Sequence, residues 1–90
     1  MDITLIVSLT KERLGIRTNV RDTLLTAIAQ GIVAELTDEK GVVLVEDDLN
    51  HLMFCVDYAT WRYQNPSSDV PRHLQYRLHN MIIHAGSDTT

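Results

Sequence analysis

Apolar residues fall into four main runs along the chain, and their spacing predicts four helices. The first run, over about residues 2–14, fits two structures, because some of its apolar side chains alternate as in a strand and others recur every three or four residues. We favour a helix, since Leu14 is followed by Gly15, and glycine often ends a helix in the left-handed conformation. Lys11 and Arg13 in the last turn also suit the negative end of a helix dipole.

The second run predicts a helix that starts with an oxygen cap from Thr18, Asn19 or Asp22 and ends before Thr37. Its expected buried stripe follows the helical period and consists of Leu25, Ile28, Ile32, Val33 and Leu36. Gly31 within this helix costs about 1 kcal/mol relative to alanine. Two explanations are open for it, a close crossing of two helices or a tolerated weakness.

The segment Val42-Val43-Leu44-Val45 follows a polar break and predicts a short extended piece, because three of its four residues are β-branched. An exposed apolar strand tends to aggregate unless something covers it. A neighbouring subunit would cover it, or the segment folds back over the core of its own chain.

The third helix is expected to begin with a cap from Asp47 or Asp48 and to end at about Gln64, before Asn65-Pro66. Two apolar stripes run along it, one made of Leu49, Leu52, Met53, Val56, Ala59 and Tyr63 and the other of Phe54, Tyr58 and Trp61. A helix that is apolar on most sides is usually buried at the centre of its domain.

Asp57 is the only charged residue between Leu49 and Trp61. A charge in a mostly buried helix normally needs a partner of opposite sign. The candidate partners are Arg13, Arg72 and Arg77. We expect Asp57 to act as a structural clamp between helices rather than as a catalytic group.

A fourth helix is expected to open after a cap from Asp69, with Pro71 near its first position, and to stop at Gly86. Its expected buried stripe consists of Leu74, Leu78, Met81, Ile82 and Ala85. Together these segments predict an all-α fold, a compact bundle of about four helices with an extended loop between the second and third helices. Ninety residues correspond to a single domain that spans 1–90.

Charge and composition narrow the classes of function. The net charge is −4 and the pI is about 5.4, which argues against tight binding of nucleic acid. No stretch approaches the roughly 20 apolar residues of a membrane span, so no membrane partner is expected. With Cys55 as the single cysteine, an intramolecular disulfide is excluded, as suits a reducing cytoplasm.

Candidate chemistry is sparse, and we expect no enzyme, no catalytic residue, no metal site and no cofactor. His73, His79 and His84 are spaced six and five residues apart. Two zinc ligands on one helix face need spacings of three or four. Cys55 lies in the most apolar helix, where a buried inert thiol is the expected state.

Charges of opposite sign gather in different parts of the chain. Six acids and one lysine lie between Glu35 and Asp48, whereas four bases and one acid lie between Lys11 and Arg21. Residues from Arg62 to Arg77 hold three arginines and one acid. Such runs are often ordinary solvated surface, but they also suit complementary patches that steer identical subunits head-to-tail.

Three stretches resemble a known family. They are Arg13-Leu14-Gly15-Ile16 followed by Arg21-Asp22, then Asp57-Tyr58-Ala59-Thr60-Trp61-Arg62-Tyr63, and Pro71-Arg72-His73-Leu74-Gln75-Tyr76-Arg77-Leu78-His79-Asn80. Their order and spacing over residues 5–84 resemble the head–tail connector proteins (head-completion or adaptor proteins, active in DNA packaging) of long-tailed double-stranded DNA bacteriophages.

The resemblance implies a structural virion protein. Such proteins form a ring, typically twelvefold, between the portal and the tail, and extend the DNA channel after genome packaging. The implied partners are copies of the chain itself, the phage portal protein, a tail-side completion protein and, in passing, double-stranded DNA. The implied location is the head–tail interface of the virion, with the host cytoplasm during assembly.

Under this resemblance the loop after the second helix reaches toward the channel or a neighbour. The expected interface with a subunit or the portal consists of Val42, Val43, Leu44, Val45, Arg72 and Arg77. Asp38, Glu39 and Glu46 are expected to form an acidic loop that faces the channel, where negative charge would let DNA slide.

The alternative is a small helix-turn-helix DNA-binding regulator. Its recognition helix would expose basic or amide side chains near its N-terminal end. The fourth helix offers Arg72, His73, Gln75 and Arg77 for that role.

Overall fold

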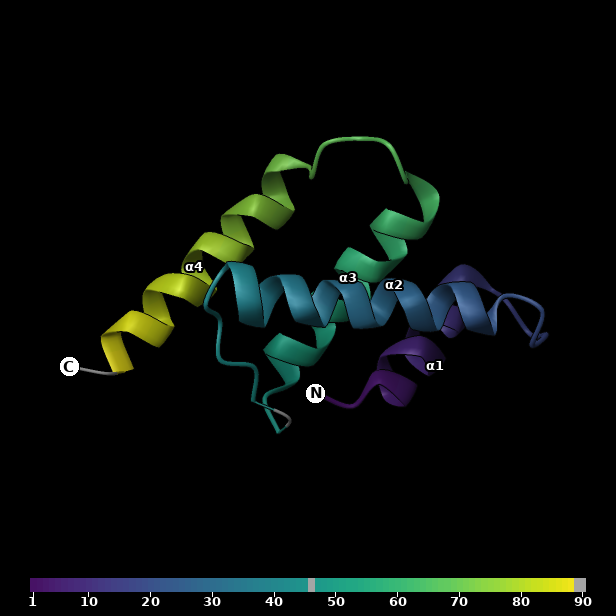
Figure 1. Cartoon of the computed structure of the whole chain (residues 1–90), viewed down its shortest axis with the longest axis horizontal. Coiled ribbons are helices and arrows are strands. Elements are labelled where there is room, and N and C mark those ends of the chain that lie inside the picture. The colour runs from purple at the N-terminus through teal and green to yellow at the C-terminus, as the bar shows by residue number, and fades with distance from the viewer. Residues whose placement is uncertain (46, 89–90) are drawn as a thin grey trace.

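In the computed structural model, which describes residues 1–45 and 47–88, four α-helices and one π-helical turn are connected by loops (Figure 1). The elements are α1 (Ile3–Leu14), α2 (Asp22–Ala34), η1 (Glu35–Glu39), α3 (Leu49–Gln64) and α4 (Arg72–Asp88). The described residues contain no strand, and an extended loop joins η1 to α3. The prediction of an all-α bundle with this loop is therefore confirmed.

Local capping at both ends explains why the first segment is a helix rather than a strand. The Asp2 carboxylate accepts a hydrogen bond from the Leu5 amide at 3.2 Å, which satisfies one of the first free N–H groups of α1. At the other end Gly15 adopts the left-handed conformation with φ of 75°, and the Ile16 amide donates to the Lys11 carbonyl at 2.9 Å.

The predicted caps of the second helix are wrong. Residue Arg21 occupies the cap position and makes no side-chain cap hydrogen bond. The Lys11 ammonium explains the difference, because it binds the Asn19 side-chain oxygen at 3.3 Å and the Asp22 carboxylate at 2.7 Å. Those oxygens thus tie α2 to α1 across the intervening loop.

The helical path also continues past the expected end at Thr37. One π-helical turn, η1, extends it to Glu39, and the Lys40 amide donates to the Glu35 carbonyl at 3.0 Å. The Thr37 hydroxyl donates to the Val33 carbonyl at 2.8 Å, so this polar side chain bonds to the helix backbone and does not end the helix.

Helix α3 is central, as its two apolar stripes predict, because it packs against α1, α2 and α4. The Asp48 carboxylate caps it by accepting from the amides of Asn50 at 2.9 Å and His51 at 3.3 Å. Leu49 was expected in the buried stripe but is exposed, since the core along α3 begins one turn later at Leu52.

Helix α4 begins at Arg72, and the Pro71 carbonyl accepts from the Gln75 amide at 3.1 Å. The predicted stop at Gly86 is wrong, because the helix runs on to Asp88. Glycine lowers helix propensity without forbidding a helix. Among the helices of the described chain, α4 packs closely against α3 alone, and it diverges from the body toward the C-terminus (Figure 1).

The core lies between α1, α2 and α3 and is closed on one side by the start of α4. Its buried apolar members are Ile6, Val7, Leu25, Ala29, Ile32, Leu36, Val42, Leu52, Phe54, Cys55, Val56, Tyr58, Ala59 and Leu74. Only Leu74 of this set belongs to α4. The last helix therefore contributes little to the core and leaves most of its length available on the surface.

Candidate interaction surfaces

The Asp57 carboxylate joins three helices. It accepts from the Arg13 guanidinium of α1 and, at 2.6 Å, from the Arg77 guanidinium of α4. Arg77 also lies over the Phe54 ring, 5.2 Å from its centroid. Two of the three candidate partners thus meet Asp57, whereas Arg72 is exposed at the start of α4. This arrangement holds α1 and α4 on the central helix.

Alternate residues of the segment after η1 point inward and outward. Val42 is 2% exposed and belongs to the core, and its amide donates to the Leu36 carbonyl at 2.8 Å. Leu44 is half-buried against the same core. Val43 and Val45 are 70% and 47% exposed. Four of the six residues expected at an interface lie in this segment. Val42 and Leu44 pack within their own chain, which corrects the prediction for these two, whereas Val43 and Val45 remain outside.

A histidine holds this segment in place. The Val45 amide donates to Nδ1 of His51 at 3.0 Å, so the ring proton of neutral His51 sits on Nε2. That nitrogen lies 3.6 Å from the Asp48 carboxylate. The two exposed valines are thus presented on a segment that is anchored to the first turn of α3.

The N-terminal end of α2 combines exposed apolar side chains with positive charge. Val20 is 84% exposed and Leu24 is 47% exposed. Arg17 and Arg21, their neighbours along the chain, are also exposed. Because α2 lies along the longest axis of the molecule, this basic end occupies one extremity (Figure 1).

The opposite end of the α2–η1 path combines exposed apolar side chains with negative charge. Asp38 and Glu39 are exposed on η1, and Asp47 is exposed before α3. The exposed Val43 and Val45 lie on the loop between them. The molecule therefore carries an acidic end and a basic end, each with uncovered apolar side chains.

A groove of about 360 Å³ lies between α2 and α3. Ala27, Ile28, Gly31 and Ile32 line it from α2, Glu35 and Glu39 from η1, and Arg62 from α3. Its apolar part comes from α2, and its charged part lies at the η1 end. The sequence offered only an indirect sign of this groove, the unexplained Gly31, because the lining residues come together only in the fold.

A polar network borders the groove. The Tyr58 hydroxyl donates to the Glu35 carboxylate at 2.6 Å and accepts from the Arg62 guanidinium at 3.1 Å. Arg62 also lies over the Trp61 ring, 5.0 Å from its centroid. Burial and the hydrogen bond to Glu35 raise the pKa of Tyr58, so the hydroxyl stays protonated and keeps donating.

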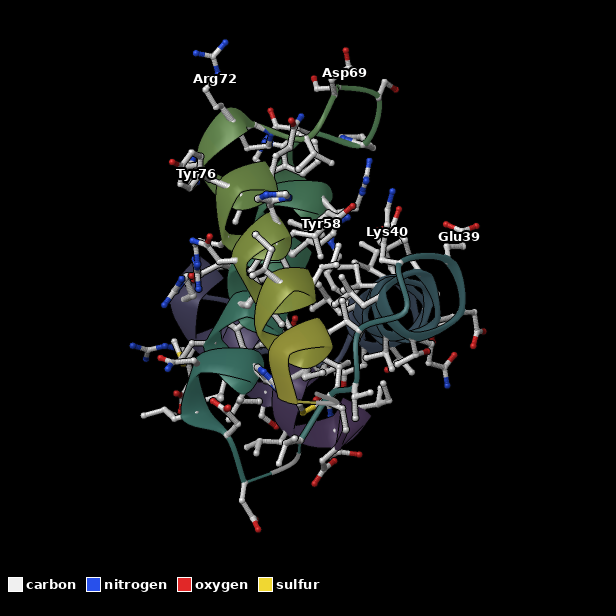
Figure 2. All side chains as sticks on the ribbon, turned by 90° about the vertical axis from the view of Figure 1, so that its left-hand side faces the viewer. Glu39, Lys40, Tyr58, Asp69, Arg72 and Tyr76 are labelled. Atoms are coloured by element: carbon white, nitrogen blue, oxygen red, sulfur yellow. The ribbon has the colours of Figure 1, made fainter. Side chains whose placement is uncertain are left out.

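A row of exposed side chains runs along the outward face of α4. Arg72, Tyr76, His79 and Ile83 are exposed and follow each other at helical spacings of four, three and four residues. Tyr76 is 69% exposed. Arg72 and Tyr76 lie on the side of the molecule opposite Glu39 and Lys40 (Figure 2).

No family model, curated protein or solved structure matches this chain. The features that bear on its function are therefore its own surface: the two charged ends, the groove and the outward face of α4.

The described residues contain little that suggests catalysis. Cys55 is fully buried, and burial raises the pKa of its thiol to about 11, so it is a poor nucleophile at neutral pH. No group of three His, Cys, Asp or Glu side chains that would hold a metal ion occurs in the part of the chain that the structure describes. The side chain of His84 lies outside the described residues. Within the described range, no helix is long and apolar enough to span a bilayer.

Proposed function

We propose that this chain is a structural subunit that associates with copies of itself as a ring-forming adaptor between portal and tail, extending the DNA channel of a long-tailed phage. The observation that carries the proposal is the pair of opposite ends on the α2 axis. Val20 and Leu24 lie beside basic residues at one end, and Val43 and Val45 lie beside acidic residues at the other. The resemblance over residues 5–84 indicates which kind of assembly this would be.

Opposite charges at opposite ends favour a head-to-tail contact. A contact between two identical ends would bring like charges together, whereas a head-to-tail contact brings the basic end of one copy to the acidic end of the next. The charges steer the encounter, and the exposed valines and Leu24 add apolar area that leaves water on contact. A head-to-tail contact closes into a ring when the rotation per copy fits.

The acidic end also suits a channel through which DNA must slide. Asp38 and Glu39 are exposed, and carboxylates there would repel phosphates rather than bind them. Glu46 lies outside the described residues. A structure of the chain on its portal should place Asp38 on the channel wall, and its position on the outer wall of the ring would contradict this part of the proposal.

The geometry gives less support to a helix-turn-helix regulator. Of the four side chains that would read DNA, Arg77 is bound to Asp57, and the Gln75 amide donates to the Val70 carbonyl at 2.7 Å. The other two, Arg72 and His73, are exposed. Two side chains are few for reading a major groove.

Sedimentation of the full chain tests the proposal. At low salt and rising concentration we expect the average mass to grow beyond the 10.2 kDa monomer, and to fall again at high salt. Reversing the basic end (Arg17→Glu with Arg21→Glu) or the acidic end (Asp38→Lys with Asp47→Lys) should abolish association. Combining all four changes should restore it, because the two ends are then complementary again.

The portal protein encoded in the same genome supplies the second test. Mixed with it, the chain should co-sediment, and negative-stain images should show added density on one face of the portal ring. A chain that stays monomeric alone at every concentration and also with this portal would overturn the proposal, as would a genome without a portal gene.

A further inference from the structure

We infer that neighbouring copies are joined by α4 of one copy lying antiparallel in the α2–α3 groove of the next, with Tyr76 entering the groove beside Gly31. This inference rests on the proposed self-association and adds a second contact to the one between the charged ends. It explains two features that the fold of a single chain leaves without a purpose, the exposed stripe of α4 and the open space at Gly31.

The donor surface is the outward face of α4. Leu74, Leu78 and Met81 face the core of their own chain, so they hold the helix in place. Tyr76 and Ile83, 69% and 50% exposed, point away from it. Large aromatic side chains are frequent anchors of protein interfaces, because they bury much area at a small cost in side-chain entropy.

The acceptor surface is the groove. A Cβ atom built on Gly31 would meet nothing within 4 Å, so no contact in its own chain requires glycine there. The missing side chain instead keeps the middle of the groove open. Leu24 is 47% exposed and lies one helical turn before Ile28 on α2. It extends the apolar surface of the groove toward the N-terminal end of that helix.

The two surfaces have the same residue spacing. Leu24, Ile28, Gly31 and Glu35 follow each other along α2 and η1 at steps of four, three and four, as do Arg72, Tyr76, His79 and Ile83 along α4. Side chains with this spacing share one face of a helix. An antiparallel alignment therefore pairs Arg72 with Glu35, Tyr76 with Gly31, His79 with Ile28 and Ile83 with Leu24.

Charge and size both favour this alignment over its reverse. The antiparallel pairing brings the Arg72 guanidinium to the acidic end of the groove, where Glu35 and Glu39 lie. Glu35 accepts one hydrogen bond from Tyr58, which leaves carboxylate lone pairs for a second donor. The same alignment puts the largest exposed side chain of α4 opposite the residue without a side chain. The parallel alignment would place Arg72 against Leu24.

A second copy is the occupant, because the chain cannot reach its own groove in this way. Arg72 and Tyr76 lie on the opposite side of the molecule from Glu39, which lines the acidic end of the groove (Figure 2). One copy thus offers α4 to a neighbour while its own groove faces another. That is a head-to-tail contact, which agrees with the proposed ring.

Filling the groove tests the contact. Gly31→Leu should leave the helical circular-dichroism spectrum unchanged, since the position is open and leucine is a good helix former. It should weaken self-association by about 30-fold or more, as expected for blocking an interface centre. Ala34→Leu is the matched control, because Ala34 is exposed on the same helix and does not line the groove. It should change association by less than about threefold.

Charge reversal tests the register. Arg72→Glu and Glu39→Lys should each weaken association by about tenfold, and the double variant should recover most of it.

Cysteine cross-linking tests proximity directly. Copies with Gly31→Cys, mixed with copies of a different mass carrying Tyr76→Cys and treated with a short bismaleimide, should give a mixed dimer. Ala34→Cys in place of Gly31→Cys should give far less.

The outcomes separate this contact from the proposed function. Association that persists with Gly31→Leu, or equal cross-linking from positions 31 and 34, would overturn the α4–groove contact and leave the ring proposal standing. A chain that never associates, alone or on the portal, would overturn both. Weakening by Gly31→Leu but not by Ala34→Leu, together with the mixed cross-link, would establish the contact.

Discussion

Arg77 of α4 donates to Asp57 of α3 across 2.6 Å, and this ion pair ties the last helix to the central one. The other Asp57 oxygen accepts from Arg13 of α1. A carboxylate that receives two guanidinium groups is satisfied on both oxygens, which explains how a charge is tolerated in the most apolar helix. The position of α4, and with it the direction of its outward stripe, depends on this clamp.

Asp57→Asn should therefore loosen α4 while leaving the fold in place. The amide keeps the size of the side chain but removes the charge that both arginines bind. Because the three side chains are partly exposed, we expect a loss of only about 1–2 kcal/mol in the free energy of unfolding. Urea denaturation measures the loss, and hydrogen exchange should show it concentrated in α4. Asp38→Asn, at an exposed carboxylate, is the control, and an equal loss there would contradict the clamp.

The buried thiol of Cys55 should make the protein less stable in alkali. Burial raises the pKa of the thiol from its ordinary value of 9.0 to about 11, although the N-terminal ammonium lowers it somewhat. A raised folded-state pKa means that the stabilising effect is complete below about pH 9 and is lost as pH rises toward 11. The raised pKa of Tyr58 acts in the same direction.

We expect the free energy of unfolding to be flat from pH 7 to 9 and to fall by the order of 2 kcal/mol by pH 11. Cys55→Ala removes the titrating thiol, so its stability should be lower at neutral pH and should decline less steeply in alkali. A thiol reagent at pH 8 should label the native chain only as fast as it opens. Rapid labelling without denaturant would show that the thiol is not buried.

His51 should control the order of the segment that carries Val43 and Val45. Its Nδ1 accepts from the Val45 amide at 3.0 Å. His51→Ala removes the acceptor and should cost about 1 kcal/mol and speed exchange of the Val45 amide by about tenfold. His51→Asn keeps an oxygen near the position of Nδ1 and should retain part of the protection. Equal exchange rates in all three proteins, measured by NMR, would show that the ring does not hold the segment.

How far the sequence predicts this fold depends on how local each signal is. The start and end of α1 follow from Asp2 and Gly15, which act within one helical turn, and glycine at the helix end was a sufficient signal. The start of α2 was mispredicted because Lys11, from another helix, takes the oxygens of Asn19 and Asp22. That competition depends on tertiary structure and gives no signal in the sequence around the start of α2.

The interaction surfaces also combine features that the sequence predicts with features that only the fold shows. The run of four apolar residues from Val42 to Val45, three of them β-branched, let the sequence identify the segment, but only packing against Leu36 shows which side faces the core. The charge at Asp57 predicted a partner of opposite sign, and the geometry selected Arg13 and Arg77. The groove was not predicted, because its lining joins residues of α2 and η1 to Arg62 of α3.

Gly31→Ala should stabilise the isolated chain, which distinguishes a glycine kept for a partner from one kept for its own fold. A Cβ there meets nothing within 4 Å, and the residue lies inside a regular helix. Alanine is favoured over glycine in such a helix by about 1 kcal/mol, so thermal unfolding should shift upward by several degrees. Ala34→Gly, at an exposed position of the same helix, should shift it downward by a similar amount. A loss of stability on Gly31→Ala would mean that the glycine serves the packing of its own helices. A gain in stability with unchanged or weaker self-association would instead fit an open site reserved for a neighbouring copy.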